Sequence, residues 1–183
     1  MSDFERSVKS IEKIIQNLQG VHKIIPYSPM GAFILGSCFI DALAGFHSGR
    51  ELEVKEKLPN WGKQYKAFIQ RYMRGYNTHL LWRDVRCKLV HDFAFNGAYA
   101  YTHRAETKEK GAKHLSKAQI TVPGSATQTK VVLVAEDFLK DIEKAGQKYL
   151  KEVVNDVPKL RNNAIRRYKI LGSYHGDAKA ATL

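Results

Sequence analysis

Acidic residues are scarce in this chain, and several common markers of protein function are missing. The 183 residues include 18 Asp and Glu against 30 Lys and Arg, which leaves a formal net charge of +12. There are two cysteines, Cys38 and Cys87, and no CxxC pair, so we expect neither a disulfide scaffold nor a thiolate zinc site. HExxH and HxxxH spacings, GxGxxG loops and Walker-type loops are also absent. The sequence therefore predicts no metal site and no cofactor.

Long hydrophobic runs are lacking as well. The longest, from Met30 to Phe46, is shorter than the ~20 residues of a membrane span and contains Asp41, which favours a buried core helix. The N-terminal segment carries a charge at its third residue and has no uninterrupted apolar stretch, unlike a secretory signal. We therefore expect a cytoplasmic protein that does not insert into a membrane.

Helical periodicity is abundant. Apolar residues recur at helical spacing in six segments, 4–18, 32–46, 61–75, 77–93, 135–156 and 158–171. Between 97 and 134 the pattern alternates and is interrupted by glycine and proline, which predicts a small β-hairpin or an irregular insertion. Together these patterns predict a mostly α, single-domain helical bundle over residues 1–172, followed by a flexible tail at 173–183.

Positive charge is concentrated in one part of the chain. Between Lys55 and Val90 there are nine basic residues and two acidic ones, a local excess of seven. A surface of one sign on two successive helices can follow a phosphate backbone, whereas an ordinary solvated face usually mixes both signs. Both interpretations remain open. The first assigns nucleic-acid binding to five residues: Lys63, Lys66, Arg71, Arg74 and Arg83.

Aromatic side chains lie between these cations and could stack on unpaired bases. At helical spacing, however, aromatic residues more often belong to the core. Both interpretations, base stacking and core packing, concern the same five residues: Trp61, Tyr65, Tyr72, Tyr76 and Trp82.

Arg86 and His91 carry the groups that metal-free RNA cleavage requires. Histidine can transfer protons near neutral pH, and a guanidinium can stabilise the negative charge that develops on phosphate oxygens. In an α-helix an offset of five residues turns the two side chains about 140° apart. The pair would then cooperate only at a frayed helix end or in a site shared between subunits.

The segment LLWRDVRCKLVHDF, residues 80–93, resembles the helix that carries the Rx4-6H motif of the HEPN superfamily. The upstream apolar helix CFIDALAGF and the later helix FLKDIEKAGQKY are also similar to those of bacterial HEPN-type proteins. The resemblance spans roughly residues 32–171. It implies an all-α bundle that forms a homodimer, with a site at the dimer interface where Arg86 and His91 act on RNA without metal. Members of the superfamily include toxins of toxin–antitoxin pairs and RNases of antiviral defence.

Cys87 departs from the pattern, because the position after the motif arginine is often Asn, Asp or His in active members. A thiol is a poor substitute for a hydrogen-bonding amide. The alternative is therefore a catalytically inactive HEPN-like module that binds nucleic acid, or an antitoxin or other protein partner. In that case Arg86 would pair with a nearby carboxylate and His91 would cap the last carbonyls of its helix.

Four further residues could support the site. An isolated buried carboxylate is costly, so Asp41 is expected either to face the motif arginine or histidine or to make a structural hydrogen bond. The other three lie beside the motif in the sequence: Asp84, Lys88 and Asp92.

Overall fold

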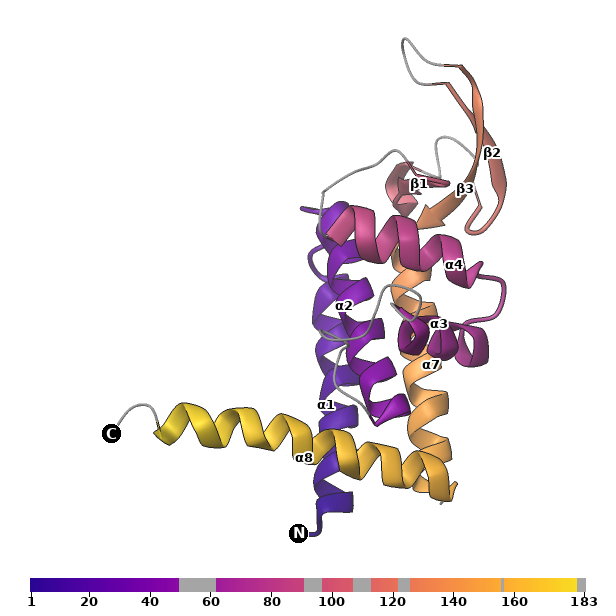
Figure 1. Ribbon diagram of the computed structural model, residues 1–183. Coiled ribbons are helices and arrows are strands. Elements are labelled where there is room, and N and C mark those ends of the chain that lie inside the picture. Colours follow the sequence, from indigo (N-terminus) through magenta and orange to yellow (C-terminus); the bar gives the residue numbers. More distant parts are fainter. Residues whose placement is uncertain (50–61, 91–96, 107–112, 122–125, 156, 181–183) are drawn as a thin grey trace.

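The chain folds as a mostly helical bundle with a small sheet at one end, as the sequence predicts (Figure 1). The computed structural model describes residues 1–49, 62–90, 97–106, 113–121, 126–155 and 157–180, the last eight of them as backbone alone.

Helices α1 (Asp3–His22) and α2 (Pro29–Ser48) form the first hairpin of the bundle. A capping box begins α1, since the Ser2 hydroxyl accepts from the Glu5 N–H and the Glu5 carboxylate accepts from the Ser2 N–H. Helix α2 ends at Gly49, whose φ of +69° is the left-handed conformation that glycine adopts without strain.

Helix α3 (Lys63–Tyr72) is followed by one helical rod made of α4 (Thr78–Leu80) and η2 (Leu81–Leu89). The side chain of Asn77 accepts a hydrogen bond from the Leu80 N–H and so starts this rod. Its η2 part is π-helical, with bonds between residues five apart. This corrects the expectation of an ordinary α-helix over residues 77–93, of which 91–93 lie outside the described residues.

Three short strands form the sheet, in the order β1, β3, β2. Strands β2 (Lys117–Ile120) and β3 (Gln128–Val134) are antiparallel, which is the expected hairpin. Strand β1 (Tyr99–Thr102) runs parallel to β3 on its other side, with Tyr99 opposite Val131. The valine-rich end of β3 is buried and leads directly into the next helix.

Two long helices complete the chain, α7 (Ala135–Val154) and α8 (Pro158–Ala180). Proline at the first position suits α8 because its missing N–H would have no helical partner there. The sequence pattern places the end of this helix near Leu171, yet it continues to Ala180, through a stretch that has no proline and ends in the good helix formers Ala-Lys-Ala. Flexibility of the tail stays a prediction.

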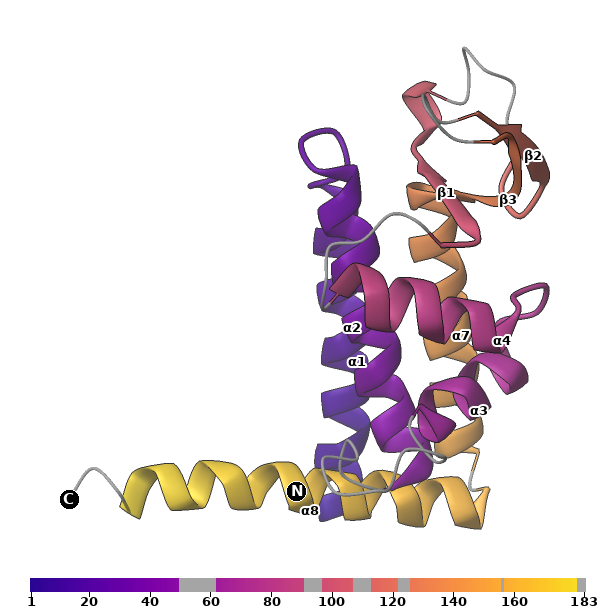
Figure 2. The ribbon, with the colours of Figure 1, turned by 45° about the horizontal axis from the view of Figure 1, so that its top comes forward.

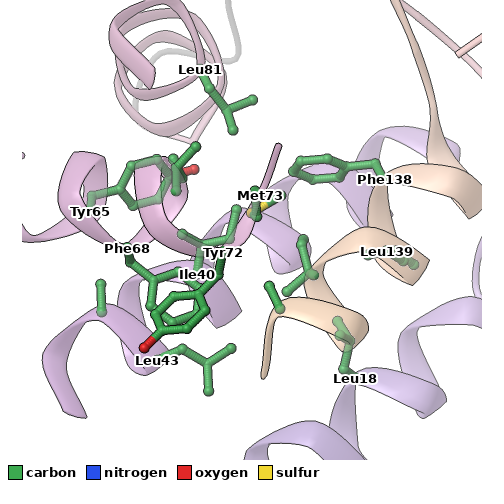
Figure 3. Close-up of a cluster of buried hydrophobic side chains, with 14 of the residues drawn as sticks. Leu18, Ile40, Leu43, Tyr65, Phe68, Tyr72, Met73, Leu81, Phe138 and Leu139 are labelled. Atoms are coloured by element: carbon green, nitrogen blue, oxygen red, sulfur yellow. The ribbon is translucent and has the colours of Figure 1, made fainter. Parts of the chain in front are cut away.

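Helices α1, α2 and α7 stand side by side, and α8 crosses them at the end opposite the sheet (Figures 1 and 2). The rod of α4 and η2 crosses α2 at a steep angle (Figure 2). A continuous core fills the space between these elements, and α7 packs closely against α2. Figure 3 shows part of this core, with Phe138 and Leu139 from α7 and with Ile40 from α2 near Tyr72 from α3. Gly36 permits this close approach, since a Cβ there would lie 2.9 Å from both of those α7 side chains.

Helix α2 is the one described helix long and apolar enough to cross a membrane by length and composition. Half of its most apolar window is buried within the protein, as in a core helix. Leu35 is the one large hydrophobic residue of this helix that is exposed, at 41%.

Candidate functional site

The helical rod that carries Arg86 is anchored through one of its faces. Leu81, Val85 and Leu89 are fully buried, as their spacing of four residues predicts. Arg86 lies on a different side of the rod, with 22% of its side chain exposed. The core therefore fixes η2 in place while Arg86 reaches the protein surface.

Arg86 forms an ion pair with Asp41 of α2, through its Nε and the carboxylate Oδ2. The Asp41 side chain is 12% exposed, and a carboxylate with so little water around it needs a charged or hydrogen-bonding partner. Of the expected alternatives, the structure thus gives Asp41 the motif arginine as its partner. A guanidinium is a group suited to phosphate, and the ion pair with Asp41 fixes the orientation of this one.

Polar side chains of α2 and α3 border this ion pair. Burial, and then the negative charge of Asp41, raise the pKa of the Cys38 thiol, while Arg86 acts in the opposite direction. Tyr65 is buried behind the pair, and its hydroxyl lies 3.0 Å from the Ser37 hydroxyl. Burial raises the Tyr65 pKa well above its ordinary value, so the phenol is neutral.

His91 and Asp92 lie outside the described residues. The helix type in front of them nevertheless changes the geometric expectation. Residues five apart are hydrogen-bonded partners in a π-helix and lie closer around the axis than in an α-helix. The 140° divergence calculated for an α-helix does not apply within η2, which contains Arg86 and ends at Leu89, two residues before His91.

Asp84 faces the sheet rather than Arg86. Its fully buried carboxylate accepts from Arg83 Nε at 2.5 Å and from the Ala98 N–H at 2.7 Å, and Lys88 Nζ lies 3.8 Å away. Burial raises the Asp84 pKa, but the hydrogen bonds from Arg83 and Ala98 outweigh burial and leave the pKa below its ordinary value. A Cβ at position 97 would lie 2.5 Å from the Asp84 Cγ, so Gly97 is required for this contact.

Three of the five residues assigned to nucleic-acid binding are engaged within the chain. Arg71 binds the Glu152 carboxylate at 2.7 Å, Arg83 binds Asp84, and the Lys66 ammonium lies 4.3 Å from the centre of the Trp82 ring. Lys63 and Arg74 are exposed, and in the described part of the chain neither forms an ion pair.

The aromatic residues near these cations follow the core interpretation. Tyr65, Tyr72 and Tyr76 are buried, and Trp82 is half-buried against Lys66. Trp61 lies outside the described residues.

One polar cluster escaped the sequence analysis. The Tyr76 hydroxyl donates to Asp141 Oδ2 at 3.0 Å and lies 2.8 Å from His114 Nε2, while His114 Nδ1 accepts from the Val134 N–H. Because Nδ1 is an acceptor, the neutral His114 ring carries its proton on Nε2. These residues lie far apart in sequence and match no motif, so no local pattern marks the cluster.

Among the described residues, no three His, Cys, Asp or Glu side chains are placed to hold a metal ion. No family model, curated protein or solved structure matches this chain. Its function therefore has to be argued from its own residues.

Proposed function

We propose that this protein is a HEPN-like endoribonuclease that cleaves RNA without a metal ion, with Arg86 and His91 as catalytic residues. The observation that carries the proposal is the ion pair of Arg86 with Asp41. A partly exposed guanidinium is held by a carboxylate of the neighbouring helix, five residues before a histidine. π-Helical segments, such as the one containing Arg86, are also frequent at functional sites.

The reaction is an attack of the ribose 2′-oxygen on the adjacent phosphorus. The 2′-hydroxyl proton passes to one histidine, the bond from phosphorus to the 5′-oxygen breaks, and a second histidine protonates that leaving oxygen. Arg86 stabilises the extra negative charge on the phosphate oxygens in the transition state. The products are a 2′,3′-cyclic phosphate and a 5′-hydroxyl.

Two histidines are available if two copies of the chain meet at this site. Two exposed residues of α2 support such a homodimer, because Cys38 and Leu35 lie about one and two turns before Asp41. In the dimer both copies of Arg86 and His91 border one cleft.

The test is cleavage of end-labelled single-stranded RNA in excess EDTA. The wild-type protein should release fragments with 2′,3′-cyclic phosphate ends, and His91→Ala and Arg86→Ala should each slow cleavage by about 100-fold or more. His79→Ala is the matched control, because His79 is an exposed histidine of the same rod, and it should cleave like the wild type.

Cleavage that persists unchanged in both site variants contradicts the assignment of Arg86 and His91. RNA that is bound but not cut favours the alternative of an inactive binding module. Cys87, and the exposed Lys63 and Arg74, are the features that favour this alternative.

A further inference from the structure

A cavity of about 310 Å³ opens at the sheet end of the bundle. It lies where the end of α1, the residues after β1 and the first turn of α7 come together. Its volume is at the lower end of the range for small-ligand sites. Its lining residues are His22, Ile25, Pro26, His103, Ala105 and Glu136.

The walls of the cavity combine apolar surface with three groups that form hydrogen bonds. Ile25, Pro26 and Ala105 supply the apolar part, and the imidazoles of His22 and His103 come from separate elements. Imidazole rings can both stack on a planar ligand and form hydrogen bonds with it.

Glu136 is held in position before any ligand arrives. The Arg104 backbone N–H lies 3.1 Å from Glu136 Oε1 and 3.0 Å from Oε2, so it orients the whole carboxylate. An ionised carboxylate has about four acceptor positions, and one N–H leaves most of them for other donors. The cavity thus offers a fixed carboxylate that can accept from two adjacent donors.

The two histidines and the glutamate border one cavity, yet they do not form a group that could hold a metal ion. A ligand that contacts all three must therefore be larger than an ion. A flat, partly apolar ring system suits walls that alternate between imidazole and aliphatic side chains.

We propose that this cavity binds a guanine base. Guanine presents two adjacent N–H donors on its Watson–Crick edge, N1–H and the exocyclic amine, and both can bind the two oxygens of Glu136. Adenine and cytosine each present one donor beside an acceptor, which a carboxylate repels, and uracil presents one donor between two acceptors. The site recognises the base and not the phosphates, so it needs no glycine-rich loop.

The same base occurs in a free nucleotide and in an unpaired guanosine of RNA. The second source would make the cavity a specificity site of the proposed ribonuclease. Guanine binding does not depend on cleavage, however, so it can be measured whether or not Arg86 and His91 act on RNA.

The test is titration of the full chain with GMP and with AMP. Calorimetry measures the binding, and NMR monitors the signals of the histidine rings. GMP should bind about tenfold more tightly than AMP or better, and should shift the signals of His22 and His103. Glu136→Gln keeps an acceptor for the Arg104 N–H but replaces one oxygen with a donor. This variant should abolish the preference, because an amide no longer accepts from both donors of guanine, whereas it does match the donor and acceptor of adenine.

Glu12→Gln is the control, since it removes the same charge from an exposed position of α1. It should leave the preference for GMP unchanged. Equal binding of GMP and AMP, no binding of either at millimolar concentration, or a preference that Glu136→Gln does not alter would each overturn the proposal. A further titration compares GMP with a uridine oligonucleotide that contains one guanosine. If the oligonucleotide binds more tightly than GMP, the cavity is assigned to RNA, and if the two bind equally, it is assigned to the free nucleotide.

Discussion

Asp41 and Arg86 carry opposite charges at a place where little water reaches them, with 12% and 22% of their side chains exposed. Removing one partner leaves the other charge poorly solvated, which costs more than the pair itself contributes. Exposed pairs behave differently, because water and salt screen both charges. The described residues contain both kinds, since Asp3 and Lys169 form an exposed pair at 3.3 Å.

Asp41→Ala should lower the free energy of unfolding by about 2–3 kcal/mol, as measured by urea denaturation. Asp3→Ala, the matched control in an exposed pair, should lower it by about 0.5 kcal/mol or less. The double variant Asp41→Ala/Arg86→Met should recover part of the loss, because the unpaired charge is gone. Equal costs for Asp41→Ala and Asp3→Ala would show that the buried ion pair does not hold η2 against α2.

Among the elements, η2 and β1 are joined by the buried Asp84 carboxylate, which accepts from the Ala98 N–H just before β1. The link has a definite pH dependence. In the folded protein the pKa of Asp84 lies below its ordinary value of 3.8. The ionised carboxylate therefore contributes stability that is fully present above pH 3.8. This contribution is lost as the pH falls through the lower folded pKa.

The stability difference between the wild type and Asp84→Asn should therefore be constant from pH 7 to about 5 and shrink below about pH 4. Urea denaturation of both proteins at a series of pH values measures this difference. Other carboxylates with lowered pKa values, Asp141 and Glu152, are common to both proteins and cancel in the comparison. A difference that grows on acidification would contradict the assigned direction.

The helices could be predicted because their apolar residues repeat at a local spacing. Their ends were less predictable: the apolar pattern of the last helix ends near Leu171, yet α8 continues to Ala180. The π-helical winding of η2 was not predictable, since the row of Leu81, Val85 and Leu89 is buried in either type of helix. The parallel pairing of β1 with β3 joins residues about 30 positions apart and leaves no local pattern.

The candidate site was predictable where the sequence around a residue marks that residue, either by a motif or by a charge within an apolar segment. Arg86 belongs to a short motif, and Asp41 is an acid in an apolar helix, so both were identified before their contact was known. The contacts of Arg71 with Glu152 and of Glu136 with Arg104 depend on how distant segments pack. Charge counting along the sequence therefore overestimates the cations that are available to a ligand.

At the scale of the whole molecule, Leu35 is exposed on α2, the helix that also carries Asp41 of the Arg86 ion pair. Tyr27 is also exposed, at 90%, but in the connection between α1 and α2. Substitutions at Leu35 and at Tyr27 can therefore distinguish a specific dimer contact on α2 from a general effect of changing an exposed apolar residue.

Sedimentation of the wild type should show a dimer at micromolar concentration, and Leu35→Glu should yield a folded monomer with little RNA cleavage, because a carboxylate is placed in the contact. Tyr27→Glu should remain dimeric. A monomeric wild type, or a Leu35→Glu variant that stays dimeric, would rule out this face as the interface.

The packing of α7 and α8 against the first two helices also governs how the chain folds during synthesis. Helices α7 and α8, which are made last, both pack against α1 and α2. At translation rates of about 5–20 residues per second, the roughly 100 residues from the end of α2 to the end of α7 take roughly 5–20 seconds to appear. During that interval α2, the most apolar of the described helices, lacks two of the helices that pack on it, and of the described helices that contact it only α1, α3 and η2 can cover its surface.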